Sequence, residues 1–83
     1  MERATLTQLG QKIRAAREAA GYSQEGLAAA AGLSRAYFGR LERGQENLSV
    51  LTLEKVAAVL GLPLSAFFEG IPPPQALAEQ GDG

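Results

Sequence analysis

Three arginines and two very small residues lie on one face of a helix predicted between residues 35 and 43. At 100° per residue, this face is opposite Phe38 and Leu41, which point inward. The outward residues are Arg35, Ala36, Gly39, Arg40 and Arg43. The planar guanidinium of arginine matches phosphate oxygens and the edge of guanine, and small side chains let a helix backbone approach a groove closely. The face therefore indicates nucleic-acid binding, with an ordinary solvated helix surface as the alternative.

The residues before this face predict another helix, joined to it by a tight turn. Leu27 and Ala31 lie four residues apart and so share one side of this earlier helix. Gly32 follows where the helix must end, because glycine takes the left-handed conformation without a Cβ penalty. Ser34 then offers a hydroxyl that can cap the next helix. Two short helices joined in this way form a unit that can place one of them in the major groove of DNA.

The rest of the chain predicts three further helices and no strands. Apolar periodicity places one helix at about Leu6–Ala20, capped by Thr5, and another at about Val50–Leu60. Pro63 opens a short last helix, which is expected to bury Leu64, Phe67 and Phe68. The fold class predicted is therefore all-α, with five helices.

The sequence divides into a predicted domain over residues 1–70 and a tail over residues 71–83. The tail contains three consecutive prolines followed by small and polar residues, which is typical of an extended, mostly disordered segment.

The whole chain has 8 basic and 9 acidic residues and a net charge of −1, whereas residues 1–70 hold 8 basic and 7 acidic residues. Nucleic-acid-binding domains are usually basic. This balance predicts weak non-specific binding that depends strongly on salt and on dimer formation.

Composition argues against several other functions. The chain has no cysteine and no histidine, so we expect no disulfide, no metal site of the usual Cys/His type and no cofactor. No apolar run reaches membrane-spanning length and no secretory signal precedes the first helix, which predicts a cytoplasmic protein without a membrane partner. An enzyme would depend on Lys12, Lys55 or carboxylates, and none of these forms a nucleophile–base pair in the sequence pattern. We also expect no small-molecule effector.

Three stretches of the sequence together carry a family resemblance: IRAAREAAGYSQEGLA, GLSRAYFGRLERGQENLS and LEKVAAVLGLPLSAFF. The chain resembles the lambda-repressor-like DNA-binding domains of the Xre (Cro/CI) type, from Leu9 to about Phe68. The resemblance implies a five-helix bundle that binds double-stranded operator DNA as a homodimer. The segment Asn47-Leu48-Ser49 is similar to the loop of the small controller proteins of restriction–modification systems.

The resemblance also implies roles for individual residues. It places Arg35, Ala36 and Arg40 at base-reading positions, and Gln24, Arg43, Gln45 and Asn47 at positions that contact the DNA backbone. To these we add Gly39 in the base-reading set, because its small size lets the helix approach a groove, and Ser34 and Tyr37 as phosphate contacts. Arg17 and Glu42 match an ion pair that ties the first helix to the end of the third, and we expect this pair to be structural.

A dimer contact is expected on the helix at Val50–Leu60 and on the short last helix after it. Leu51 lies opposite the core-facing side of this helix, Ala58 lies two turns further along the same outer face, and Ile71 begins the tail. The alternative is that these three are ordinary surface residues, because single exposed apolar residues are normal. The function predicted is a sequence-specific transcriptional regulator that binds an inverted-repeat operator. The alternative is an antitoxin or adaptor that uses the same fold to bind proteins, for which the Pro-rich tail is the one favourable feature.

Overall fold

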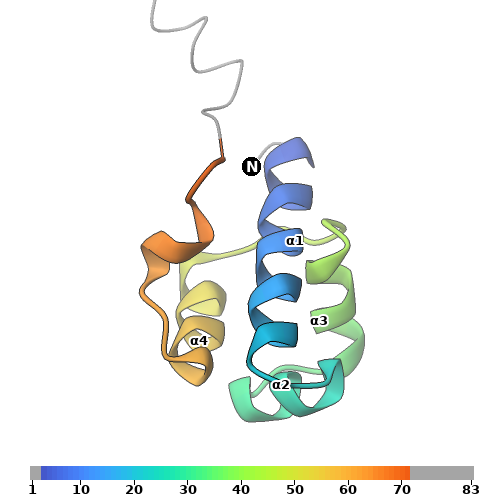
Figure 1. Ribbon diagram of the computed structural model, residues 1–83. Helices are drawn as coiled ribbons and strands as arrows, with labels where there is room; N and C mark the ends of the chain where they lie inside the picture. Colours follow the sequence, from blue (N-terminus) through green and yellow to red (C-terminus); the bar gives the residue numbers. More distant parts are fainter. Residues whose placement is uncertain (1–2, 72–83) are drawn as a thin grey trace, which may run out of the picture.

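The structure, a computed structural model, describes residues 3–71, and within this part of the chain four α-helices are followed by a short 3-10 helix (Figure 1). The elements are α1 (Arg3–Ala19), α2 (Gln24–Ala31), α3 (Arg35–Glu42), α4 (Val50–Leu60) and η1 (Leu64–Phe67). The described residues contain no strand, so the all-α class is confirmed. The predicted count of five α-helices is not confirmed, because the fifth element is a 3-10 helix of four residues.

Of the predicted tail, residues 72–83 lie outside the described residues, as do residues 1–2 of the predicted domain.

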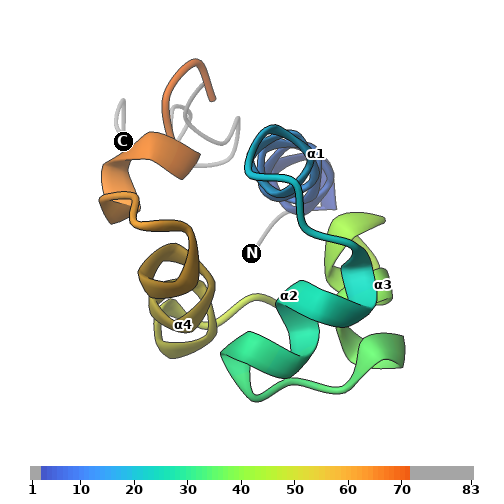
Figure 2. The same cartoon turned by 60° about the horizontal axis from the view of Figure 1, so that its bottom comes forward.

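α3 and α4 lie on opposite sides of the bundle, with α1 and α2 between them (Figure 1 and Figure 2). The outer faces of α3 and α4 therefore form two separate surfaces.

Serine side chains cap the N-termini of three of the four α-helices. The Oγ atoms of Ser23, Ser34 and Ser49 each accept a hydrogen bond from the backbone N–H three residues later, at N–O distances of 2.9, 3.1 and 3.1 Å. Each bond satisfies one of the backbone donors that a helix leaves free at its start. Gly32 and Gly61 end α2 and α4 in the left-handed conformation, with φ of 72° and 68°. These caps define the two short helices and the turn of the helix-turn-helix unit.

The first helix starts earlier than the sequence predicts. α1 already includes Arg3, so Thr5 lies within the helix and does not cap it. Arg3 and Ala4 are both good helix formers, and an apolar repeat that begins at Leu6 does not limit how far the helix extends before it. The predicted cap at Thr5 was therefore wrong.

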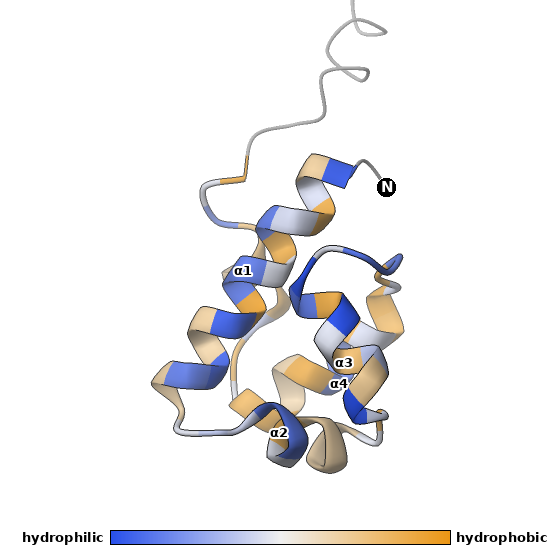
Figure 3. Ribbon diagram, turned by 90° about the vertical axis from the view of Figure 1, so that its right-hand side faces the viewer, coloured by the Kyte–Doolittle hydropathy of each residue, from blue (hydrophilic) through white to orange (hydrophobic). Residues whose placement is uncertain are grey.

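The core lies between all five elements. Its largest fully buried side chains are Phe38, Phe67, Leu9, Ile13, Leu27 and Val56. Phe68, which was predicted to be buried, is 47% exposed, because the single turn of η1 turns only Phe67 fully inward. Figure 3 shows the first part of the loop after α3 mostly in hydrophilic colours, whereas Leu48 near its end is buried in the core.

Two glycines let α1 lie directly on the end of α3. A Cβ atom on Gly10 would lie 2.5 Å from the carbonyl oxygen of Glu42, and one on Gly44 would lie 2.7 Å from Cα of Thr7. Gly44 also has a positive φ of 72°. Side chains larger than hydrogen cannot fit at these two contacts. The close approach holds the end of α3, and the loop that follows it, against α1.

Candidate nucleic-acid interface

The outer face of α3 forms a shallow hollow that contains every predicted base-reading residue. The hollow is lined by Gln24, Arg35, Ala36, Gly39, Arg40 and Arg43. Its position follows from the inward packing of Phe38 and Leu41, which are both buried. α2 contributes one side of the hollow through Gln24, and α3 with its C-cap contributes the rest. The surface therefore combines three guanidinium groups with the two smallest side chains of the helix.

Gly39 is less accessible than predicted. It is buried, and a Cβ atom built on it would lie 3.3 Å from Nη1 of Arg43. The Arg43 side chain therefore lies over Gly39, and its Nε donates a hydrogen bond of 3.0 Å to Oε1 of Gln45. The prediction that Gly39 forms part of the open surface is corrected, because a long side chain one turn further along the helix covers it.

Arg40 is held from two sides. Its Nε donates to Oε2 of Glu46 at 2.8 Å, and the two side chains are 42% and 31% exposed. The centre of its guanidinium lies 6.0 Å from the centroid of the Tyr37 ring, within the range of a cation–π contact. Glu46 was not among the predicted site residues. Its charge was visible in the sequence, but the turn that brings it back to Arg40 was not.

A buried network ties α1, α2 and α3 together. Arg17 donates from Nε to Oε2 of Glu42 at 2.7 Å and from Nη2 to Oε1 at 3.3 Å. Arg17 also donates from Nη1 to the carbonyl oxygen of Tyr22 at 2.8 Å, and Gln24 donates from Nε2 to Oε1 of Glu42 at 2.8 Å. The hydrogen bond to Glu42 raises the pKa of Arg17 above its ordinary value, against the opposing effect of burial. The network fixes where the helix-turn-helix unit sits on α1.

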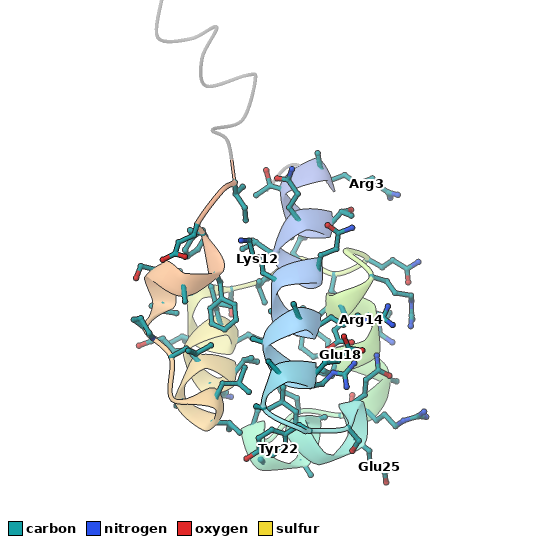
Figure 4. All side chains as sticks on the ribbon, in the orientation of Figure 1. Arg3, Lys12, Arg14, Glu18, Tyr22 and Glu25 are labelled. Carbon is teal, nitrogen blue, oxygen red and sulfur yellow. The ribbon has the colours of Figure 1, made fainter. Side chains whose placement is uncertain are left out.

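Other residues predicted to contact the DNA backbone lie outside this hollow, at the start of α3 and in the loop after it. Ser34 is exposed at the start of α3, where it also caps the helix by accepting from the N–H of Tyr37. Gln45 and Asn47 line a second hollow, which Arg3 shares. In Figure 4, Arg3 projects from the first turn of α1 toward the side of α3. Sequence reasoning missed Arg3, since only the fold brings the start of α1 beside this loop.

The predicted dimer residues do not all lie on one surface. Leu51 is 71% exposed on α4, and Ala58 is exposed on the same helix. Ile71 is instead packed against the core and lines a hollow with residues of α1, including Lys12. Ile71 is therefore partly covered by its own chain, and its role in a dimer contact stays a prediction. Val50 is a further exposed apolar residue at the start of α4 that was not predicted.

Residues 3–71 contain no group of three or more His, Cys, Asp or Glu side chains that could hold a metal ion. No helix among these residues combines the length and the apolar character needed to cross a bilayer. Every buried side-chain nitrogen or oxygen in this part of the chain has a hydrogen-bond partner.

Two characterised regulators are similar to this chain in sequence. The control protein C.MunI of a Mycoplasma species is 41% identical over 63 residues, which cover 75% of this chain and 85% of C.MunI. The transcriptional regulator SinR of Bacillus subtilis is 39% identical over 62 residues, which cover 74% of this chain. The chain spans only 56% of SinR. The likeness to SinR is therefore limited to part of that protein.

Solved structures extend the comparison to three dimensions. The restriction–modification controller protein C.AhdI of Aeromonas hydrophila superposes with a TM-score of 0.76 at 43% identity, over 78% of this chain and 98% of C.AhdI. SinR in complex with DNA superposes with a TM-score of 0.70 at 37% identity, over 74% of this chain. The helix-turn-helix family HTH_3 matches residues 13–67, which include α2, the turn and α3. This chain therefore belongs to the HTH_3 helix-turn-helix family of DNA-binding transcriptional regulators, the Xre-type group that its sequence resembles.

Proposed function

We propose that this chain is a sequence-specific transcriptional regulator that binds an inverted-repeat operator as a homodimer, with α3 in the major groove. The observation that carries the proposal is the hollow on the outer face of α3, where three arginines surround Ala36 and Gly39. An arginine fork is suited to the O6 and N7 atoms of guanine, and small residues allow close approach of the helix. The family membership supports DNA as the partner.

Within this proposal, the site residues have two kinds of role. Arg35 and Arg40 read guanines, and Ala36 and Gly39 let the helix approach the base edges. The phosphate contacts come from Gln24, Ser34, Tyr37, Arg43, Gln45 and Asn47. Because the Arg43 side chain lies over Gly39, close approach of Gly39 to a base requires Arg43 to move aside. Arg3 adds a further cation beside the loop that holds Asn47.

The dimer contact in this proposal is the outer face of α4, through Leu51 and Ala58. Two copies joined there place their α3 helices about 34 Å apart, one turn of DNA. Leu51→Glu introduces a charge into the contact, so we expect a monomer in sedimentation and a roughly hundredfold weaker operator complex. Ala15→Glu is the matched control, because it adds the same charge at an exposed position of α1. An unchanged dimer of the Leu51 variant would contradict this contact.

The similarity to C.MunI and C.AhdI supports a regulator of the controller type, since the chain covers 85% and 98% of these two proteins. A reporter gene placed behind the recognised operator tests this role. We expect its expression to change when the chain is produced, and to stay constant when Arg40→Ala is produced at the same level. A reporter that does not respond to the wild-type chain would contradict a regulatory role.

The experiment that tests the DNA-binding proposal is selection of sites from a random duplex pool, sequenced after a few rounds. We expect enrichment of an inverted repeat that contains guanines, with half-sites about one helical turn apart. The protein is checked by circular dichroism and sedimentation in the same buffer. A folded dimer that enriches no sequence would contradict the proposal and favour a protein-binding adaptor.

A further inference from the structure

We propose that Glu46 is a specificity-determining residue that positions Arg40 for guanine and disfavours other DNA sequences. The inference rests on the proposed function, in which Arg40 reads a base. It concerns a residue of the loop after α3 that belongs to neither the predicted base-reading set nor the predicted phosphate-binding set. Glu46 acts through Arg40, as a positioning residue.

The geometry leaves Arg40 able to bind a base while it stays paired with Glu46. The carboxylate of Glu46 accepts from Nε of Arg40 at 2.8 Å. A guanidinium has five N–H donors, and four of them lie on the two Nη atoms at the far end of the fork. A guanine edge needs two donors, for O6 and N7. The pair with Glu46 therefore uses the inner nitrogen and leaves the outer end of Arg40 for the groove.

Tyr37 restricts Arg40 from another direction. Its ring lies one helical turn before Arg40 on α3, with its centroid 6.0 Å from the guanidinium carbon. A side chain that is already oriented loses less conformational freedom when it binds. With Glu46 at Nε and Tyr37 beside the guanidinium, Arg40 is held in one orientation before it meets DNA.

The pair is not needed to build the loop. The backbone N–H of Gln45 donates to the carbonyl oxygen of Arg40 at 2.9 Å, and that of Gly44 donates to Leu41 at 3.1 Å. These two bonds, together with the contact of Gly44 on α1, set the path of the chain after α3. Partly exposed ion pairs contribute little to folding stability. The pair of Arg40 and Glu46 therefore has a geometry that the fold itself does not require.

The charge of Glu46 adds discrimination against the wrong sequence. A carboxylate at the edge of a DNA-binding face repels phosphates on every sequence. On a site with guanine, Arg40 keeps its bond to Glu46 and gains the base. On other sequences Arg40 gains no base, and it must leave Glu46 to reach a phosphate. Specificity is the difference in affinity between these two situations. The repulsion of phosphates is the same in both, so Glu46 widens the difference through the bond to Arg40, which is kept on guanine and lost on other sequences.

Glu46→Gln tests the inference, because the amide is of similar size and has no charge. Binding is measured on the selected operator, on operators with the guanine opposite Arg40 replaced, and on random duplex. We expect affinity for random duplex to rise about threefold, because one repulsive charge is lost. We expect the preference for guanine at that position to fall about tenfold. The melting temperature should stay within about 2 °C of the wild-type value.

Two further variants make the outcome specific to Arg40. Glu18→Gln removes a carboxylate from the exposed pair with Arg14 on α1, and it should change neither the affinity nor the base preference. In an Arg40→Ala background, Glu46→Gln should still raise binding to random duplex but should no longer alter base preference. A change of base preference in that background would overturn the positioning role.

The result also separates this inference from the proposed function. If the wild-type chain enriches an operator and Glu46→Gln keeps its guanine preference within twofold, the inference is overturned while the proposed function stands. If the wild-type chain enriches no operator, the proposed function fails, and the inference fails with it. A loss of affinity for operator and random duplex by the same factor in Glu46→Gln would also overturn the inference.

Discussion

Two arginine–glutamate pairs involve the C-terminal end of α3, and their N–O distances are almost equal. Nε and the carboxylate oxygen are 2.7 Å apart in the pair of Arg17 and Glu42, and 2.8 Å apart in the pair of Arg40 and Glu46. The side chains of the first pair are 10% and 2% exposed, and those of the second are 42% and 31% exposed. Burial, and not distance, therefore distinguishes an ion pair that stabilises the fold from one that is accessible to DNA.

The partners of the two pairs point to the same division. Glu42 also accepts a hydrogen bond from Gln24, and Arg17 also donates to the backbone of Tyr22, so the buried pair connects three helices. A charge left without its partner in such a place is costly. Arg40 and Glu46 connect one helix only to the loop that follows it. Either of these two side chains can turn to solvent or to DNA at little cost in stability.

The largest effect is expected from Glu42→Ala. It leaves the guanidinium of Arg17 buried without its partner, so the free energy of unfolding should fall by about 3–5 kcal/mol. Urea denaturation followed by circular dichroism measures the change. The double variant Arg17→Met with Glu42→Leu is the control, and it should recover much of the loss because no buried charge remains. A loss of less than about 1 kcal/mol in the free energy of unfolding of Glu42→Ala would contradict the structural role of the buried pair.

The pH dependence of this effect follows from the raised pKa of Arg17. A base whose pKa is raised by folding contributes stability at every pH below its ordinary pKa, and loses it only as the pH rises through the raised value. The contribution of Arg17 should therefore be the same at pH 6 and at pH 8, and be lost only in strongly alkaline solution.

Arg40→Ala should give an intermediate effect of a different kind. We expect the discrimination between guanine and other bases at one position of each half-site to fall by about 1–3 kcal/mol. The free energy of unfolding should change by less than about 0.5 kcal/mol, since the side chain is partly exposed. Arg43→Ala is the matched comparison, and it should weaken binding to all sequences alike. It should also reduce the slope of log affinity against log salt by about 1, the contribution of one phosphate contact. If both variants lose affinity uniformly, Arg40 does not read a base.

The smallest effect is expected at a third arginine–glutamate pair, which is more exposed than the other two. Arg14 and Glu18 lie four residues apart on α1, with an N–O distance of 3.4 Å and side chains that are 64% and 57% exposed. Glu18→Gln should lower the free energy of unfolding by no more than about 0.5 kcal/mol, and added salt should remove the difference. Urea denaturation at low and high salt measures it. A loss that matched Glu42→Ala would contradict the importance of burial.

Much of this arrangement could be predicted from the sequence, because it depends on residues that are close along the chain. Ser34 before a helical repeat and Gly32 after one indicate where α2 ends and α3 begins. The periodicity that turns Phe38 and Leu41 inward also turns Arg40 outward. Short-range capping and the repeat of 3.6 residues per turn are enough to place these side chains.

The remaining features depend on contacts between elements, which the periodicity of one helix does not contain. The return of Glu46 to Arg40 depends on the path of the loop after α3. The contact of Gly10 with the end of α3 depends on how two helices cross. Ile71 was assigned to a dimer contact because it begins the tail and could cover an apolar patch. In the structure it packs against the core beside α1, a contact within the chain that the sequence alone does not indicate.

The measurement that tests the central claim most directly is a crystal structure of the chain bound to its selected duplex. We expect α3 in the major groove, the Nη atoms of Arg40 on a guanine, and its Nε still within hydrogen-bond distance of Glu46. The buried pair of Arg17 and Glu42 should be unchanged from the free protein. A complex in which Arg40 contacts only phosphates, or in which α3 faces away from the bases, would contradict the account.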